Sequence, residues 1–371
     1  MPGRLPRKYC AQLPGQRFVL YVRGVVAARP SRRDKETNKN QRIDAGTVHL
    51  YCQLNPTYNP AMTSVLIFGP AGQVGSIAAR TAGELGATVW LAMRDTSKSI
   101  PSLTTEAEAA GDYHRIYADL EKPETVTEAV KTSGAKRVFL YLVHHASDHL
   151  HGTITAMKAA GVDFVVFLSS FTILVNQPLR EIPPSDILPF IHAQVEANLD
   201  DIFGPDHYVA VRPGCFITNL LSEKAGIVAN HVELYGGEFE QDNIVPSDIG
   251  RVVGNILVSG PKNGQKKVYL YGPEILSLHD SIARIGKALQ KDLKITDLGP
   301  REMYQKYLSS GMPPSFADYM IKTLSTKGPD KGNGERFPNY KEGVSNVSLY
   351  AGHPATRLEA WVEQNKAIFH A

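Results

Sequence analysis

Cysteine is scarce in this sequence, which has three cysteines in 371 residues. Cys10, Cys52 and Cys215 are too few and too widely spaced for a disulfide framework or a zinc site. The scarcity excludes the small, disulfide-stapled secreted proteins and makes a reducing compartment the default. We therefore expect a cytoplasmic protein.

Long hydrophobic runs are also missing. No uninterrupted apolar stretch approaches the roughly 18 to 20 residues that a membrane-spanning helix needs, so we expect no membrane partner. The chain has no internal repeat, and its 43% hydrophobic and 21% charged residues are typical of a globular enzyme rather than a disordered chain. Its length suits one large α/β domain, or a cofactor-binding domain with a smaller lobe.

Acidic residues are rare only near the N-terminus. Residues 1–61 contain eleven Lys/Arg and three Asp/Glu, and because the whole chain has a net charge of +3, residues 62–371 carry a net charge of −5. A mildly acidic body gives no reason to expect a nucleic-acid partner.

The basic leader, residues 1–61, has three interpretations. Its first 33 residues contain eight Lys/Arg and no acid, the composition of a presequence that would place the protein in mitochondria. A secretory signal is disfavoured because Arg23 interrupts the only apolar run. Alternatively the leader is not part of the working protein, because Met62 lies two residues before the first predicted strand. In each case we predict a leader, disordered or removed, outside the fold.

The most informative stretch is a strand, a glycine turn, a helix and a second strand. The run 64–68 is short and rich in branched residues, as in a fully covered strand. A helix is predicted at 76–85 and a second strand at 88–93. Between the first strand and the helix lies a turn with GxxGxxG spacing, which comprises Gly69, Pro70, Ala71, Gly72, Gln73, Val74 and Gly75.

This turn predicts dinucleotide binding. A pyrophosphate sits against backbone N–H groups at a helix N-terminus, where the helix dipole favours an anion by about 1 kcal/mol. Side chains there would hold the phosphate away, so glycine fits. The spacing departs from GxGxxG, but the strand before it and the helix after it are those that the motif requires. A plain strand-to-helix turn is the alternative.

The end of the second strand distinguishes the two nicotinamide cofactors. An acidic residue there binds the ribose hydroxyls of NAD, whereas arginine accommodates the 2′-phosphate of NADP. The strand ends Met93-Arg94-Asp95, with Ser97 and Lys98 just beyond. We predict NADP (NADPH), with Arg94 and Lys98 at the 2′-phosphate. A small rotation could present the Asp95 carboxylate instead.

Further strands are predicted at 113–118, 137–143, 164–171 and 208–211, with helical stretches between them. This alternation indicates a doubly wound parallel-sheet Rossmann fold. Ligands collect at the carboxyl ends of such strands. Asp119 and Leu120 are candidates to bind the adenine, although Asp119 could instead be a turn or capping residue. Ser169 is a candidate to polarise a substrate oxygen, although it could instead cap the strand end. Other candidates to contact the cofactor are Leu142, Val143 and Pro213.

Beyond Gly214 the alternation loosens. We predict an NADP-binding domain over residues 62–215 and a smaller, mostly helical substrate lobe over 216–371, part of which returns to the sheet. Its predicted elements are helices at 245–257 (capped by Ser247), 278–289, 302–309, 316–324 and 357–369, strands at 267–271 and 294–298, and a linker at 326–334. The substrate would lie near Phe171, Phe216 and Asn219.

A histidine cluster follows the strand at 137–143. His145 and His149 are four residues apart, with His144 and Asp148 beside them, which raises the question of a metal. No further ligand cluster completes a coordination shell. We therefore predict no metal and interpret these as loop histidines near the cofactor.

Several motifs occur in an order found in a known family: the turn 69–75, Arg94, Asp119-Leu120, His192-Ala193-Gln194-Val195-Glu196, Arg212-Pro213-Gly214 with Asn219, Asp248-Ile249, and Gly352-His353-Pro354 with Trp361. From about Met62 to the C-terminus the chain resembles the NmrA-like family of atypical short-chain dehydrogenases/reductases. The resemblance implies a Rossmann domain that binds NADP. Some members reduce quinones, dyes or isoflavonoid-type substrates, and others are redox sensors.

The sequence departs from ordinary short-chain dehydrogenases at the catalytic pair. Those enzymes use Tyr-x-x-x-Lys, in which the lysine lowers the pKa of the tyrosine. Here the corresponding positions hold Leu188 and His192. The chain is most similar to quinone- and dye-reducing members, which have a histidine in place of the lysine. A histidine with a pKa near neutrality could bind the nicotinamide ribose and protonate the product, or it could merely orient the cofactor.

We therefore predict an NADPH-dependent oxidoreductase that transfers hydride to a small hydrophobic acceptor, aromatic or quinone-like. Its catalytic candidates are His192 and Ser169. The alternative is a non-catalytic NADP(H)-binding redox sensor. We expect a monomer or a homodimer.

Overall fold

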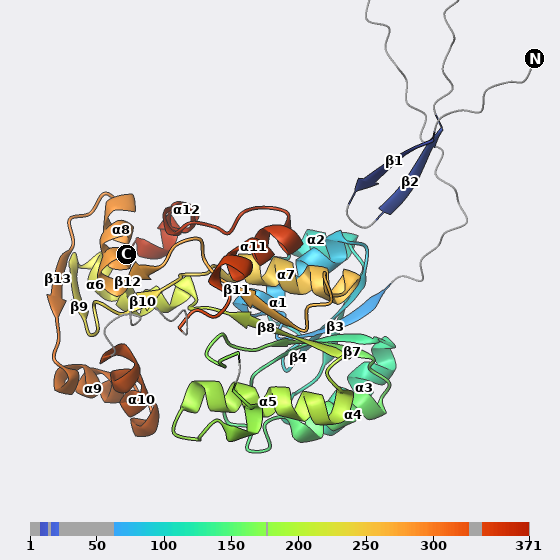
Figure 1. Ribbon diagram of the computed structural model, residues 1–371, viewed down its shortest axis with the longest axis horizontal. Helices are drawn as coiled ribbons and strands as arrows, with labels where there is room; N and C mark the ends of the chain where they lie inside the picture. The colour runs from blue at the N-terminus through green and yellow to red at the C-terminus, as the bar shows by residue number, and fades with distance from the viewer. Residues whose placement is uncertain (1–7, 14–15, 22–62, 176, 326–335, 371) are drawn as a thin grey trace, which may run out of the picture. The chain divides into compact units, whose positions relative to one another are not determined.

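The computed structural model describes residues 8–13, 16–21, 63–175, 177–325 and 336–370 (Figure 1). The chain divides into two compact units, Met1–Asn59 and Pro60–Ala371. In the first, β1 (Lys8–Leu13) and β2 (Gln16–Tyr21) pair as an antiparallel hairpin with Lys8 opposite Tyr21. The rest of the leader and the whole of the predicted 326–334 linker lie outside the described residues, so the predictions for them stay predictions.

The second unit is built on a parallel seven-stranded sheet in the order β11-β8-β7-β6-β3-β4-β5. The strands are β3 (Ser64–Phe68), β4 (Thr88–Met93), β5 (Tyr113–Tyr117), β6 (Arg137–Tyr141), β7 (Phe164–Leu168), β8 (Tyr208–Pro213) and β11 (Lys267–Leu270). The pairing of β3 with β4 runs from Ser64 opposite Thr88 to Phe68 opposite Ala92. The direction of winding reverses between β3 and β6, and ligands bind at such a switch point.

Helices cover both faces of this sheet (Figure 1). On one face α1 (Gln73–Glu84) packs against α7 (Pro246–Ser259), which packs against α11 (Tyr340–Ala351). The other face carries α3 (Pro123–Ser133), α4 (His151–Ala159) and α5 (Ile187–Phe203). The short helix α2 (Thr105–Ala110) precedes β5. Each face of the sheet thus has its own apolar core.

The C-terminal portion forms a third apolar cluster. Two short sheets lie here, one of β9 (His231–Leu234) with β13 (Lys294–Asp297) and one of β10 (Glu240–Gln241) with β12 (Leu276–Ser277). The helices here are α6 (Lys224–Val228), α8 (Leu278–Ala288), α9 (Pro300–Ser309), α10 (Pro314–Ser325) and α12 (Leu358–Gln364). Short 3₁₀ helices among the described residues are η1 (Leu179–Glu181), η2 (Ile217–Glu223) and η3 (Lys366–Phe369).

The predicted fold class, a doubly wound parallel sheet with a helical C-terminal portion, is confirmed. Several boundaries were wrong. Helix α1 begins three residues early because the end of the glycine turn forms its first turn. Strands β6 and β7 end at Tyr141 and Leu168. Ser247 does not cap α7, which begins at Pro246 without a side-chain cap. The predicted last helix is interrupted at Asn365.

The division at residue 215 stays a prediction, although β11 does lie in the main sheet. None of the helices in the described part of the chain has the length and apolar character needed to span a membrane.

Candidate functional site

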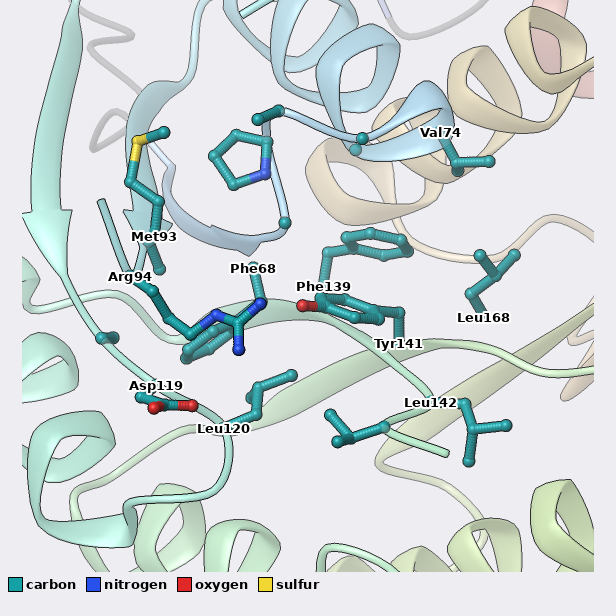
Figure 2. A pocket seen from close by; sticks show the side chains of 18 of the residues that line it. Phe68, Val74, Met93, Arg94, Asp119, Leu120, Phe139, Tyr141, Leu142 and Leu168 are labelled. Carbon is teal, nitrogen blue, oxygen red and sulfur yellow. The ribbon is translucent and has the colours of Figure 1, made fainter. Parts of the chain in front are cut away.

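A cavity of about 590 Å³ lies at the carboxyl ends of β3, β4 and β6 (Figure 2). Many residues singled out in the sequence line it: Gly69, Pro70, Ala71, Gly72, Gln73, Val74, Gly75, Arg94, Lys98, Asp119, Leu120, Leu142, Val143 and Phe216. Five other candidates do not line it, namely Ser169, Phe171, His192, Pro213 and Asn219. The structure therefore brings together residues from five separate segments of the chain.

The glycine turn forms one wall of the cavity. Gly69 has a left-handed backbone with φ +66°, and a Cβ on it would lie 2.7 Å from the Tyr141 ring. A Cβ on Gly75 would overlap the Gly69 carbonyl. The first turn of α1 has no side-chain cap and no acidic residue, so its N–H groups and its dipole are open to an anion. Only glycine suits both positions.

Arg94 lies at one end of the cavity (Figure 2), and Lys98, four residues further along the chain, also lines it. Arg94 is exposed and has no hydrogen-bond or ion-pair partner within the described ranges. Asp95 does not compete for it, because the Asp95 carboxylate accepts hydrogen bonds from the Ser97 N–H at 2.9 Å and the Ser97 hydroxyl at 2.5 Å. These bonds lower the pKa of Asp95. The Asp95 carboxylate is therefore hydrogen-bonded to Ser97 and not to Arg94 or Lys98, the two Lys/Arg side chains that line the cavity.

The other end of the cavity is apolar. Val74, Phe139, Leu168 and Phe216 line it, and Figure 2 shows Val74 and Leu168 on the side away from Arg94. A cavity with a cationic end and an apolar end suits an elongated ligand that carries an anion at one end and a flat ring at the other.

Tyr141 is a lining residue that the sequence analysis missed. It is the last residue of β6 and packs on Gly69. The next two residues, Leu142 and Val143, were predicted to contact the cofactor. Burial raises the pKa of its hydroxyl, and the positive charge of Arg94 opposes that rise. Its place at a strand's carboxyl end is a signal that could have identified it.

Gln73 connects the turn to the C-terminal portion. The Thr218 hydroxyl donates to Gln73 Oε1 at 2.9 Å across 145 residues of sequence. Because Thr218 belongs to η2 and Gln73 begins α1, this bond joins the glycine turn to the segment that follows Phe216, another lining residue. No local pattern in the sequence indicates it.

Ser169 belongs to a buried polar network rather than to the cavity wall. Its hydroxyl donates to Glu196 Oε1 at 2.5 Å. Arg212 donates to the same carboxylate through Nε at 2.9 Å and Nη2 at 2.6 Å, and both charged side chains have 0% exposure. The Ser169 proton is therefore engaged by Glu196, which favours its structural interpretation over a role at a substrate oxygen.

His192 lies on α5, partly buried, with its ring centroid 6.4 Å from that of Phe167 on β7. Its Nδ1 is 2.8 Å from the Leu188 carbonyl, which requires a proton on Nδ1 and leaves Nε2 as an acceptor. Burial lowers the pKa of His192 to about 4, against the raising effect of the Leu188 carbonyl. The expected pKa near neutrality was therefore wrong, and at neutral pH this histidine does not supply a proton.

This low pKa predicts a pH dependence of stability. Unfolded histidine has its ordinary pKa of 6.5, so between about pH 6.5 and about pH 4 the unfolded chain binds the extra proton and stability falls as pH falls. The stabilisation from neutral His192 is complete above pH 6.5 and is lost on acidification. Denaturant unfolding of the wild type and of His192→Gln at several pH values should show a steeper decline for the wild type. Parallel pH profiles would contradict the buried, neutral histidine.

The remaining candidates have other positions. Pro213 ends β8 and is buried, and its carbonyl accepts from the Phe171 N–H at 3.1 Å. Phe171 stacks on Phe337 with ring centroids 5.7 Å apart. Asn219 is exposed on η2. Asp148 accepts from backbone N–H groups at the start of α4. No group of three or more His, Cys, Asp or Glu side chains within the described residues could hold a metal ion.

Fold and cavity together define a class of protein. Residues 69–258 match a family of NAD(P)H-binding proteins, and the chain belongs to this family as an NmrA-like atypical short-chain dehydrogenase/reductase. Over 328 residues it is 32% identical to the nitrogen metabolite regulation-like protein bik4 of Gibberella fujikuroi, a match that covers 82% of this chain and 97% of that protein. This confirms the resemblance seen in the sequence.

Solved structures with the same fold include two reductases. The NADPH-dependent quinone oxidoreductase QOR2 of Escherichia coli, in complex with NADPH, is 21% identical with a TM-score of 0.63, and the match covers 81% of this chain and 99% of QOR2. The triphenylmethane reductase of Citrobacter sp., in complex with NADP(H), is 14% identical with a TM-score of 0.60 over 81% of this chain and 99% of the reductase. At these identities the likeness shows the fold.

Proposed function

We propose that the protein is an NADPH-dependent oxidoreductase that transfers hydride to a small hydrophobic acceptor, aromatic or quinone-like. The observation that carries the cofactor assignment is the unpaired guanidinium of Arg94 at the cavity's cationic end, with the neighbouring carboxylate of Asp95 engaged by Ser97. An arginine at this position accommodates the 2′-phosphate of NADP.

The remaining cofactor contacts follow from the cavity. The turn from Gly69 to Val74 would bind the pyrophosphate, and Asp119 and Leu120 the adenine. Leu142 and Val143 would lie along the cofactor, and the nicotinamide would reach the apolar end near Leu168 and Phe216. His192 lies outside the lining, so its predicted contact with the ribose through Nε2 requires the nicotinamide half of the cofactor to extend beyond the cavity toward α5.

The acceptor class is inferred from the three positions that the sequence analysis considered as proton donors. The tyrosine position of the usual catalytic pair holds Leu188, His192 is neutral at pH 7 and the Ser169 proton is engaged by Glu196. Ketone reduction needs an acid to protonate a basic alkoxide, whereas a quinone yields a stabilised anion and needs less acid catalysis. This chemistry supports a quinone-like acceptor.

A non-catalytic NADP(H)-binding redox sensor is the second candidate. Two observations favour it: the relative that is 32% identical is named a regulation-like protein, and the replacement of the usual catalytic tyrosine by Leu188 would suit a protein that performs no chemistry. Such a sensor would bind both cofactor forms and change partners when one is exchanged for the other.

Turnover separates these two functions. Purified protein mixed with NADPH and a panel of quinones should oxidise NADPH faster than the same mixture without protein, as followed by the absorbance of the reduced nicotinamide. Simple ketones should give much slower oxidation. Cofactor binding without turnover on any acceptor would contradict the enzyme and support the sensor.

A further inference from the structure

Arg115 is a charged residue that neither the cavity lining nor the proposed contacts use. It lies in the middle of β5, the edge strand of the sheet next to β4. Its side chain is 28% exposed, and it does not line the cavity. Its guanidinium nevertheless reaches the segment that follows β4, which carries Arg94 and Lys98.

The contacts of Arg115 divide into two sets. Nη1 donates to the Thr96 carbonyl at 2.6 Å and to the Lys98 carbonyl at 2.7 Å. Nε and Nη2 donate to the two carboxylate oxygens of Glu108 on α2 at 2.5 Å and 2.8 Å. Four of its five N–H groups are therefore used, and the fork is fixed in one orientation.

The segment held in this way is otherwise supported only within itself. Asp95 accepts from the Ser97 N–H and hydroxyl, and the Lys98 N–H donates to the Asp95 carbonyl at 3.3 Å. Its side chains are exposed. Without Arg115, this turn would have no side-chain hydrogen bond from another element within the part of the chain that the structure describes.

We propose that Arg115 is a positioning residue for recognition of the 2′-phosphate: it holds the 95–98 turn from behind so that Arg94 and Lys98 keep their places at the cavity. The inference rests on the proposed NADP preference. Arg115 acts through hydrogen bonds rather than through its field, because the paired carboxylate of Glu108 neutralises its charge nearby. The Glu108 partner also has its pKa lowered by the Arg115 hydrogen bond and so stays ionised.

Pre-organisation explains why such a brace would affect one cofactor more than the other. Two long cationic side chains on a loose turn lose conformational freedom when they bind a phosphate, and a fixed turn reduces that loss. NADH has no 2′-phosphate, so it does not gain from the fixed positions of Arg94 and Lys98. Removal of Arg115 should therefore change the ratio of the two affinities, which a general loss of stability would not do.

Calorimetric titration of Arg115→Ala with NADPH and with NADH tests the proposal. We expect NADPH affinity to fall about tenfold and NADH affinity to change less than about twofold. The pair 2′,5′-ADP and 5′-AMP should repeat this difference without the nicotinamide. Arg137→Ala is the matched control, because Arg137 Nη1 also donates to two backbone carbonyls, those of Leu257 and Val258, but lies away from the cavity. It should leave the ratio unchanged.

The outcomes separate this inference from the proposed function. An unchanged NADPH to NADH ratio in folded Arg115→Ala overturns the role of Arg115 and leaves the NADP assignment intact. If the wild-type protein does not bind NADPH more tightly than NADH, both the role of Arg115 and the NADP assignment are overturned. If Arg115→Ala does not fold, Arg115→Lys keeps the charge but loses the fork, and we expect it to lower the ratio about threefold. An unchanged ratio in that variant overturns the inference.

Discussion

Arg94→Asp should lower the affinity for NADPH about 100-fold while leaving the affinity for NADH unchanged or higher. A guanidinium that donates to a phosphate contributes about 1.5–3 kcal/mol, and a carboxylate in its place adds repulsion. Each 1.4 kcal/mol corresponds to about tenfold in affinity. The substitution replaces one of the two Lys/Arg side chains that line the cavity with a carboxylate. Titration calorimetry with both cofactors measures the effect.

The control for Arg94→Asp is Arg301→Asp. Arg301 is exposed on α9 and does not line the cavity, and its substitution changes the net charge by the same amount. It should leave both affinities within about twofold, since exposed charges farther away than the Debye length of roughly 10 Å are screened. Equal losses in the two variants would mean that Arg94 acts only through the overall field, and no loss in Arg94→Asp would remove the cofactor assignment.

Glu196→Ala should lower the free energy of unfolding by about 3–5 kcal/mol, because it leaves a buried charge uncompensated. Arg212 has 0% exposure. Without Glu196 it would keep only the Ile173 carbonyl at 3.2 Å and the Tyr269 hydroxyl at 2.9 Å. Ser169 would also lose its acceptor. Urea unfolding of this variant and the wild type gives the difference.

Asp206→Ala is the matched comparison for that prediction. Asp206 also pairs with a cation at close range, Lys266 at 2.6 Å, but the two side chains are 75% and 53% exposed. Exposed pairs of this kind contribute about 0–1 kcal/mol. If Glu196→Ala loses no more stability than Asp206→Ala, the buried pair is not a structural element of the site.

The strands were largely predictable because most are short runs rich in branched or aromatic residues between turns. Strands at 64–68 and 88–93 were predicted with the bounds that the structure has. Helix α11 was not predicted, because Gly343, Ser345, Asn346 and Ser348 give it little helix propensity. It forms against β11, where the absence of a side chain at Gly343 lets it lie on the Tyr271 ring. Tertiary packing therefore outweighs local propensity there.

The residues of the site also differ in how far the sequence predicted them. The glycine turn and Arg94 were identified because each directly follows a predicted strand, and the carboxyl ends of parallel strands lie at the same edge of a sheet. By contrast, the bonds of Glu196 with Ser169 and Arg212, of Thr218 with Gln73, and of Arg115 with Thr96 and Lys98 join distant segments. The pKa of His192 depends on burial, which a residue's identity does not reveal.

The central claim is that the glycine turn and Arg94 together bind NADP(H). Titration calorimetry of the full chain with NADPH and with NADP+, each compared with its form lacking the 2′-phosphate, tests it most directly. We predict saturable binding of both phosphorylated forms, at least about tenfold tighter than that of NADH and NAD+. The absence of binding by either phosphorylated form up to millimolar concentration would contradict both the oxidoreductase and the sensor.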